Sequence, residues 1–501
     1  MTDPGSGPAS PLVEPVETPQ DPQTPEHVDA VVVGAGIGGL VAAHTLAERG
    51  LRVVVLEAAD RAGGPIHGGA FESLPDVPLD LGAESFAVRG GTVESLVQEL
   101  GLTVTEPAPL SAWGYAAGRA FPLPAAGMLG IPSRPWAADV RRAIGWPGAL
   151  RGALDRVLPA RFADTTDLGT FARSRLGSRV ADRLVTPVAA GVHSAPLDRL
   201  DVAAVAPGLL DAFARTGSLS RAVATLRAAA PPGSAVRGID RGIHTLVTAL
   251  VDRLDVRFGA RVTGMERGAA GAGGAAAGSG GARGEWQVRT ADGQVLRGPR
   301  LVLATRTGFS PLPAGPPELV PPPAPERGAD IRLVTLLLEA PDLDSAPRGS
   351  GMLVAPGTAP GSVRAKALTH ATAKWPWLAR RVRDAVGPGW HVVRLSYGRI
   401  GEPTPRPTAE EAARDASALL GVDLTGRVRD TLHQHWDGSL PPPTPAYRAA
   451  VKRFVEAALA EPGLDVTGGW IAGTGLAAIV AHARGTADRL GASGTAPDAG
   501  F

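Results

Sequence analysis

Hydrophobic positions between residues 29 and 58 form two continuous runs separated by a segment with helical spacing. The runs are DAVVV at residues 29–33 and LRVVVLEA at residues 51–58, and GAGIGGLVAAHTLAERG lies between them. Short continuous apolar runs indicate buried strands, and apolar residues recurring every three to four positions indicate a helix. The pattern therefore predicts a βαβ unit with a glycine-rich first turn.

Beyond this unit the pattern changes several times. It is mostly helical up to about residue 235 and then returns to helix and strand. A Gly- and Ala-rich run at residues 268–284 separates VTGMER from EWQVRTADGQVL, which we expect to pair as strands around a flexible loop. After a proline-rich linker come the strand-like segments IRLVTLLLEA, GMLVAP and HVVRLSYGRI. The final block, GGWIAGTGLAAIVAHARGTADRL, reads as strand, glycine turn and helix.

These blocks predict a discontinuous architecture of mixed α/β and α+β class. Sequence patterns typical of a nucleotide-binding domain occur near the beginning, the middle and the end of the chain. We therefore expect one Rossmann-like cofactor domain with two insertions, one helical and one a mixed sheet that binds the substrate. The expected divisions are a disordered tail at 1–28, cofactor-domain parts at 29–105, 236–310 and 446–490, a mainly helical domain at 106–235, a substrate-binding domain at 311–445 and a tail at 491–501.

Composition removes several classes of function. The chain has 501 residues, a formal net charge of +1 and no cysteine. Without cysteine there are no disulfides, thiolate metal ligands, cysteine nucleophiles or cysteine-linked cofactors, and no basic stripe suggests nucleic-acid binding. The first 28 residues contain no lysine or arginine, unlike a secretory signal or a transit peptide. No uncharged apolar run is long enough to span a bilayer, so we expect a cytoplasmic protein without a transmembrane segment.

The first turn of the βαβ unit carries the spacing of a dinucleotide-binding motif. Gly34 permits the tight turn, Gly36 lets the backbone approach a pyrophosphate, and Gly39 lets helix and strand pack closely. The amides at the start of the helix then face the phosphates. Glu57 ends the next strand about twenty residues on, where an acid can accept the ribose hydroxyls and repels a 2′-phosphate.

The residues after Glu57 distinguish between two dinucleotides. Arg61 is followed by the pair Gly63 and Gly64. This arrangement resembles the second phosphate contact of flavoproteins that bind two dinucleotides, where the forked donor of an arginine neutralises the extended pyrophosphate of a flavin adenine dinucleotide. Pro65 comes next and removes one amide donor from the turn. We expect a cofactor site for FAD rather than NAD, with an altered local contact at the proline.

Three stretches together resemble the flavin-dependent porphyrinogen oxidases, a branch of the amine-oxidase-like FAD superfamily. They are LEAADRAGGPIHGGAF, LDLGAESFAVRGGTVESLVQELGL and GGWIAGTGLAAIVAHARGTADRL, and LVTPVAAGVHSAPLDRL, RGIHTLVTAL and HVVRLSYGRIGE match further family landmarks. The resemblance extends from about residue 29 to residue 490. It implies FAD as the cofactor and oxidation of coproporphyrinogen III or protoporphyrinogen IX, in haem biosynthesis, as the activity.

The resemblance also implies where the cofactor contacts lie. The loop at residues 82–85 would run beside the flavin ring, Val262 would offer a backbone contact to adenine, and Trp436 would lie near the flavin. The last glycine turn would face the isoalloxazine, where a helix N-terminus stabilises the negative charge of reduced flavin. Relatives often carry Val and Pro where this chain has Thr474 and Ala477. The complete predicted set is Gly34, Ala35, Gly36, Ile37, Gly38, Gly39, Glu57, Ala58, Arg61, Gly63, Gly64, Pro65, Gly82, Ala83, Glu84, Ser85, Val262, Trp436, Gly473, Thr474, Gly475, Leu476 and Ala477.

The implied reaction moves a hydride from a meso carbon to flavin N5, with oxygen reoxidising the flavin, so no catalytic side chain is predicted. The substrate does require cations for its propionates. The predicted substrate contacts are Arg89, His193, Arg364, Lys366 and Arg394, with Lys374 and Arg399 among the further candidates. His433 and His435 lie on one face of a predicted strand, but no third ligand stands near them in the sequence, so no metal site is predicted.

Two alternatives stay open at this stage. One is another FAD oxidase or desaturase of the same superfamily, and the other is a non-catalytic protein that binds a porphyrin or a flavin. Coproporphyrinogen III is favoured over protoporphyrinogen IX as the substrate because it carries four propionates and the chain is rich in arginine. The expected partners are this substrate, oxygen and, transiently, the next enzyme of haem synthesis.

Overall fold

The computed structural model describes residues 25–88, 90–191, 195–229, 236–268, 284–306, 319, 321–356, 363–402, 404, 406–439, 441 and 444–492. Two of the predicted substrate contacts, Arg89 and His193, lie outside the described residues. So do residues 1–24 of the predicted tail, the interior of the 268–284 loop and residues 493–501.

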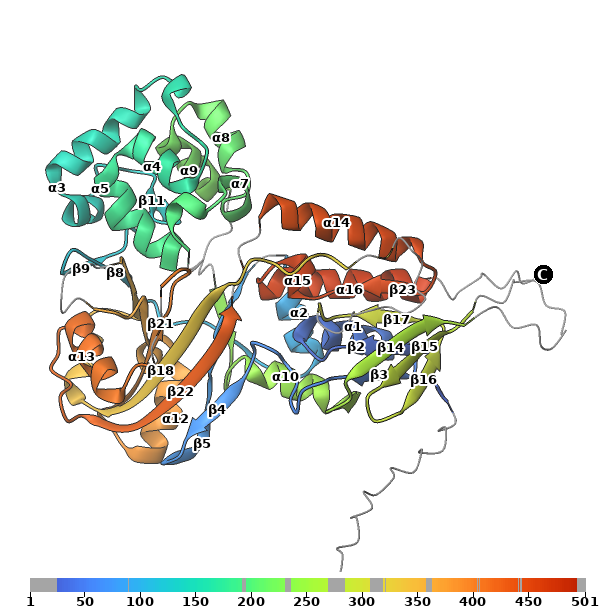
Figure 1. The fold of residues 1–501 in the computed structure, drawn as a ribbon. Coiled ribbons are helices and arrows are strands. Elements are labelled where there is room, and N and C mark those ends of the chain that lie inside the picture. Colours follow the sequence, from blue (N-terminus) through green and yellow to red (C-terminus); the bar gives the residue numbers. More distant parts are fainter. Residues whose placement is uncertain are drawn as a thin grey trace, which may run out of the picture.

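A five-stranded parallel sheet forms the centre of one half of the molecule (Figure 1). Its strands run in the order β13-β3-β2-β17-β23 and come from four separate stretches of the chain. The central strands AVVV and VVVL are wholly buried, as expected of parallel strands covered on both faces. The bounds are β2 Ala30–Val33, β3 Val53–Leu56, β13 Asp255–Arg257, β17 Leu301–Leu303 and β23 Leu464–Val466.

Helices cover one face of the parallel sheet. Leu40, Leu246 and Val480 come from three different helices and share one buried cluster with Val32 and Val55 of the sheet. The first and last described helices, α1 and α16, lie side by side, so segments from near both ends of the described chain meet here (Figure 1). The helices of this layer are α1 Ile37–Ala47, α2 Thr92–Glu99, α10 His244–Val251 and α16 Leu476–Ala492.

A four-stranded sheet, antiparallel except where β1 pairs in parallel with β16, covers the opposite face together with one long helix. Val31 and Val54 of the parallel sheet pack in one cluster with Val288 of the small sheet and Phe454 of the helix. VTGMER and EWQVRT pair as the sequence predicts. The elements are β1 Glu26–His27, β14 Val262–Arg267, β15 Trp286–Thr290, β16 Val295–Gly298 and α14 Pro445–Ala460.

A seven-stranded sheet forms the second half, in the order β22-β18-β21-β20-β19-β8-β9. Helix α13 (Ala409–Leu420) packs on one face, while α11 (Ala371–Lys374), α12 (Pro376–Val386) and the hairpin β4 (Gly68–Phe71) and β5 (Leu74–Asp80) pack on the other. The strands are β22 Val428–Ser439, β18 Ala329–Glu339, β21 Trp390–Tyr397, β20 Ala367–His370, β19 Gly351–Val354, β8 Ala112–Ala116 and β9 Arg119–Pro122.

The last two strands of this sheet differ from the expectation, because residues 112–122 lie within the predicted helical domain at 106–235 but form β8 and β9. Strand β8 pairs in parallel with β19, more than 200 residues further along the chain. Such short strands form because they pair with a distant strand, and their own sequences show no clear alternation of apolar and polar residues. A smaller sheet of β6 (Phe86–Ala87), β12 (Val236–Ile239) and β7 (Val104–Thr105) also pairs segments that are far apart.

A helical region stands against one end of the seven-stranded sheet, away from the parallel sheet (Figure 1). Gly145, with φ 71°, breaks its first helix just before Pro147, where an intact α-helix would lose a hydrogen bond. Its elements are α3 Ala138–Ala153, η1 Leu154–Arg156, η2 Ala160–Phe162, α4 Leu168–Leu176, α5 Ser178–Val180, the π-helix η3 Ala181–Ala190, η4 Leu197–Arg199, α7 Val202–Val205, α8 Leu209–Thr216 and α9 Leu219–Ala228.

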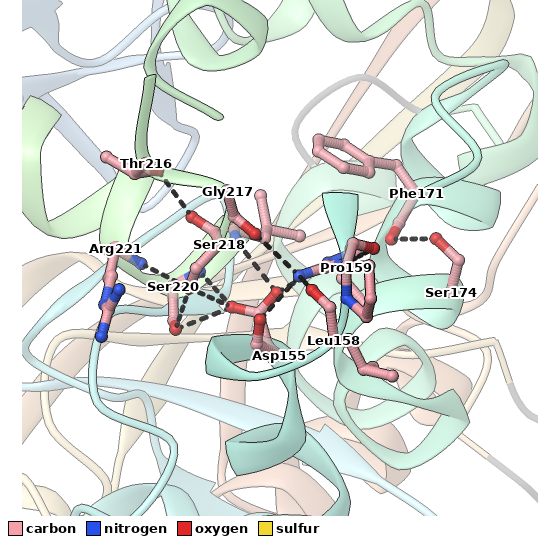
Figure 2. Close-up of polar contacts among 12 residues, drawn as sticks. Asp155, Leu158, Pro159, Phe171, Ser174, Thr216, Gly217, Ser218, Ser220 and Arg221 are labelled. Atoms are coloured by element: carbon pink, nitrogen blue, oxygen red, sulfur yellow. Dashed lines mark hydrogen bonds and ion pairs between the residues drawn. The ribbon is translucent and has the colours of Figure 1, made fainter. Parts of the chain in front are cut away.

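One buried ion pair organises the interior of the helical region. Asp155 and Arg175 are both fully buried, with Nε and Oδ1 2.8 Å apart. The dashed contacts in Figure 2 show Asp155 also accepting hydrogen bonds from Ser218 and Ser220 at the start of α9. Because every charge is satisfied, this pair ties the segment after α3 to α4 and to the turn before α9.

None of the described helices combines the length and the apolar character needed to cross a bilayer.

Candidate functional site

The turn between β2 and α1 is held by the acid that ends β3. Glu57 accepts hydrogen bonds from the amides of Ala35, at 2.7 Å, and Ala59, at 2.9 Å. The amide of Gly63 donates to the carbonyl of Ala35 at 2.8 Å. The glycine turn, the strand-end acid and the RAGG segment are therefore brought together, as their order in the sequence suggested.

Two glycines of this turn are required by close packing. Gly34 has φ 104°, a conformation that side chains disfavour. A Cβ on Gly39 would lie 2.0 Å from the carbonyl oxygen of Gly34. Larger residues at either position would push α1 away from the sheet, which is the packing that the motif predicts.

Other glycines have empty space beside them where a side chain would otherwise stand. Gly36 precedes α1, which has no side-chain cap, and a Cβ built on it meets nothing within 4 Å. The same is true of Gly473 and Gly475, which precede α16. Gly36 is half-buried and Gly473 and Gly475 are exposed, and no protein atom occupies the space beside them, so a phosphate or another anionic group could approach the start of each helix. These two cradles fit an extended dinucleotide, which needs its phosphates and its ring system bound at separate places.

Pro65 lies in close contact with the loop that was predicted to flank the flavin. Its carbonyl oxygen accepts from the amide of Ala83 at 3.4 Å, and a Cβ on Gly82 would lie 1.8 Å from it. Trp436 donates through Nε1 to the carbonyl of Leu81 at 2.9 Å. The guanidinium of Arg61 lies 5.6 Å from the Trp436 ring. Residues far apart in sequence therefore meet around the proline, whose carbonyl provides the contact.

Arg61 has protein partners in this arrangement. Its Nη1 donates to the carbonyl of Gly64 at 2.9 Å, and its charge lies over the indole of Trp436. The ring of His67 packs edge-on against the same indole. Sequence reasoning had no signal for His67, because its place is set by the hairpin that follows it.

A carboxylate flanked by two cations lies at the boundary between the two halves. Glu84 accepts from Nζ of Lys374 at 2.5 Å and from Nη2 of Arg394 at 2.6 Å. Arg394 also donates to the carbonyls of Asp80 and Gly82, at 2.9 and 3.3 Å. Burial raises the pKa of the Glu84 carboxyl, but the charges of Arg394 and Lys374 outweigh burial and hold that pKa at about 2. The group carries one net positive charge.

A second pair of cations lies elsewhere on the same sheet. Lys366 is 5% exposed, and burial together with the charge of Arg399 lowers its pKa to about 7. Arg399 donates to the carbonyl of Val354 at 3.1 Å. It also lines a cavity of about 210 Å³, to which the π-helix η3 contributes Thr186 and Ala190.

Arg364 is separate from both groups of cations. Its Nη1 pairs with Glu411 of α13, 3.0 Å away, and its side chain is 45% exposed. Helix α13 covers the face of the sheet opposite to the one occupied by α12 and the β4–β5 hairpin. The predicted substrate cations that the structure describes, Arg364, Lys366 and Arg394, therefore do not form one group.

The surroundings of the β22 histidines differ from the expectation that no further metal-ligand side chain lies near them. His435 pairs with Asp330 and has Asp437 close by, so further donor atoms do lie near it. The sequence could not reveal Asp330, which β18 brings alongside. Arg332 and Arg327 already pair with these carboxylates, so protein cations balance their charge.

Glu94, in the first turn of α2, was not anticipated. Both of its carboxylate oxygens are buried and have no hydrogen-bond partner among the described residues. The same turn meets the start of α16, where Thr92 Oγ1 donates to the carbonyl of Ala477 at 3.3 Å. Buried carboxylates are normally paired, and no sequence motif singles this one out.

Fold and site together define a flavoprotein in which one nucleotide-type domain, assembled from distant parts of the chain, adjoins a mixed-sheet domain. The comparison with protein families gives the same class, since residues 37–328 match the flavin containing amine oxidoreductases. The chain belongs to this family and is an FAD-dependent oxidoreductase.

Similar proteins extend along nearly the whole chain. A coproporphyrinogen III oxidase of Mycobacterium tuberculosis is 30% identical over 486 residues, which cover 90% of this chain and 95% of that protein. One from Staphylococcus aureus is 28% identical over 38% of this chain and 41% of its own length. Among solved structures, an Exiguobacterium protein assigned as a protoporphyrinogen oxidase has a TM-score of 0.71 at 20% identity, covering 93% of this chain and 99% of its own. That likeness concerns the fold.

Proposed function

We propose that this protein oxidises coproporphyrinogen III to coproporphyrin III, using FAD and oxygen. The observation that carries the proposal is the similarity to coproporphyrinogen III oxidases over 90% of the chain, at 30% identity. The chemistry of the bound flavin is a two-electron oxidation of the substrate, repeated until the macrocycle is aromatic, with peroxide as the product from oxygen.

The chain's own residues would first bind the cofactor. The amides at the start of α1 would receive the pyrophosphate beside Gly36, and Glu57 would accept from the adenosine ribose. Glu57 has capacity for this, since each carboxylate oxygen accepts more than one hydrogen bond and each has one protein donor. The turn at residues 473–475 and the start of α16 would lie against the ring system, where the helix dipole favours negative charge.

The substrate side supports a polyanionic macrocycle. Arg394 and Lys374 exceed Glu84 by one positive charge at the loop predicted to flank the flavin. Arg399 supplies a second cationic place beside the cavity lined by η3, although Glu402, 3.7 Å from it, offsets part of its charge. The neighbouring Lys366, with a pKa of about 7, is only partly protonated at neutral pH. Two separated cationic places suit carboxylates on different sides of a ring, and coproporphyrinogen III carries four propionates where protoporphyrinogen IX carries two. This difference favours the former substrate.

The proposal is tested by turnover of the two porphyrinogens side by side. Purified, FAD-loaded protein is mixed with each substrate in air-saturated buffer, and porphyrin fluorescence is followed against a protein-free control. We expect faster oxidation of coproporphyrinogen III, with peroxide formed in step. Faster oxidation of protoporphyrinogen IX would overturn the substrate assignment, and unchanged rates without oxygen would overturn oxygen as the acceptor.

A further inference from the structure

His67 follows the RAGG segment and lies beside the tryptophan that was predicted to be near the flavin. Its ring packs edge-on against the indole of Trp436, with 6.3 Å between the ring centroids. The same indole lies against Gly82, since a Cβ on that glycine would be 3.3 Å from Cζ2 of Trp436. His67 therefore shares a neighbour with the loop predicted to flank the flavin ring.

The backbone directs the ring of His67 toward this side. Gly68 begins strand β4, and a Cβ on Gly68 would lie 2.6 Å from the ring of His244. The amide of Leu81 donates to the carbonyl of His67 at 2.8 Å, which extends the pairing of the β4–β5 hairpin by one residue. Because successive residues of a strand point to opposite sides, His67 points away from His244 and toward Trp436.

His67 also lies close along the chain to the expected pyrophosphate site. Gly63 forms an isolated parallel bridge with Gly36, and His67 follows after residues 64–66. A segment this short spans at most about 14 Å. A flavin adenine dinucleotide joins its pyrophosphate to its ring system through a ribityl chain, so the segment runs from the cradle beside Gly36 toward the place expected for the flavin ring.

The ring of His67 is able to accept a proton. Within the described part of the chain, neither of its nitrogens has a hydrogen-bond partner, and the residue is half-buried. Burial lowers the pKa of His67 below its usual value of 6.5, and the charges of Arg61 and then His244 lower it further. His244, at the start of α10, is itself paired with Asp80 at 2.9 Å. The imidazole of His67 is therefore neutral at neutral pH and has one nitrogen lone pair for a proton.

We propose that His67 is a catalytic base, which accepts a pyrrole N–H proton of the porphyrinogen while the meso hydride passes to FAD. The inference rests on the porphyrinogen oxidation proposed above. The meso C–H bond breaks and its electron pair goes to the flavin as hydride, while the N–H bond breaks and its electron pair forms a new double bond of the macrocycle. The proton forms the second N–H bond of His67 and is later released to water, so each turn removes one hydride and one proton.

Reduction of the bound flavin by coproporphyrinogen III without oxygen tests the proposal. The rate is measured by rapid mixing between about pH 5 and pH 9, and in the wild type it should fall at the acid end as His67 becomes protonated. His67→Gln keeps a polar side chain but cannot take the proton. It should reduce the flavin at least about 100-fold more slowly at neutral pH and should lose the fall at the acid end.

Two further variants separate proton transfer from a structural effect. Added imidazole should raise the rate of His67→Ala at least about tenfold, because a free base can enter the space of the missing ring. His433→Gln is the matched control, since His433 belongs to β22 and burial lowers its pKa as well. This variant should show the rate and the pH profile of the wild type.

Two measurements that do not depend on turnover complete the test. FAD affinity, from flavin fluorescence, should be the same in His67→Gln and the wild type. NMR titration of the apoprotein, with His67 identified by the signal missing from His67→Gln, should give a pKa below 6.5. An unchanged rate in His67→Gln, a loss of FAD affinity as large as the loss of rate, or a His67 still protonated at neutral pH would overturn the proposal. A wild-type flavin that neither porphyrinogen reduces would overturn the proposed function and this inference with it.

Discussion

Arg394 of β21 donates to Glu84 across the boundary between the seven-stranded sheet and the loop that follows β5, with Nη2 and Oε2 2.6 Å apart. Arg394 also holds the carbonyl of Gly82, in the loop predicted to flank the flavin. One guanidinium thus links the substrate side of the molecule to the cofactor side. Lys374 completes the neutralisation of Glu84 from α11.

Removing the carboxylate should leave two cations without their partner. We expect Glu84→Gln to lower the free energy of unfolding by about 3 kcal/mol, because breaking a buried ion pair strands its remaining charges. Urea denaturation at neutral pH measures the change. Glu72→Gln, an exposed acid of the same β4–β5 hairpin, is the control and should unfold like the wild type. Equal stability of both variants would contradict this role for Glu84.

The titration of Lys366 predicts a change of stability in alkaline solution. Its pKa is lowered from 10.5 to about 7 in the folded protein. The folded state therefore disfavours the protonated lysine, and this lowers the free energy of unfolding by its full amount below pH 7. The loss of stability shrinks as the pH rises from about 7 toward 10.5, because the folded protein then releases the proton. Lys366→Met should be more stable than the wild type by about 4 kcal/mol at pH 6, with the difference shrinking toward pH 10. Exposed Lys452→Met should show no such trend in urea denaturation series.

A substitution at Gly36 should affect cofactor binding without affecting the stability of the fold. A Cβ at this position meets no protein atom within 4 Å, so Gly36→Ala should leave the stability of the apoprotein unchanged within about 0.5 kcal/mol. The methyl group would stand where the pyrophosphate is expected, and FAD affinity should fall at least about tenfold, measured by flavin fluorescence on titration. Gly485→Ala, within helix α16, is the control and should bind FAD normally. Full FAD affinity of Gly36→Ala would refute the predicted cradle.

The two ion pairs of the helical region should differ in strength. Asp155→Asn leaves Arg175 buried without its counter-charge and should cost about 3–5 kcal/mol of stability. Arg173 and Asp182 form an exposed pair at 3.3 Å, so Asp182→Asn should cost less than about 1 kcal/mol. Thermal or urea unfolding of both variants measures the contrast. Similar costs for the two would show that the buried network does not organise this region.

The sequence was most informative where local pattern and fold coincide. The βαβ unit, the hairpin around the 268–284 loop and the glycine turn before α16 all follow from continuous apolar runs and turn residues. The strand expected just before that glycine turn is wrong, because residues Gly469–Ala472 form the short helix α15. The contact between the glycine turn and Glu57 was also predictable, because a short motif imposes its own geometry.

Features that depend on distant pairing could not be predicted. Strand β8 takes its structure from β19, and His435 meets Asp330 only because β18 and β22 are neighbours. Arg394 was predicted from its charge as a substrate contact, but a charge pattern does not show that Glu84 already binds it. Individual side-chain partners across a sheet follow from register, which one sequence does not specify.

The central claim is that FAD in this protein accepts electrons directly from a porphyrinogen. Rapid mixing of the FAD-loaded protein with coproporphyrinogen III in the absence of oxygen, followed by visible absorbance, tests it most directly. We predict loss of the yellow flavin absorbance together with a gain of porphyrin absorbance. Flavin that stays oxidised in the presence of excess coproporphyrinogen III and of protoporphyrinogen IX would contradict the account.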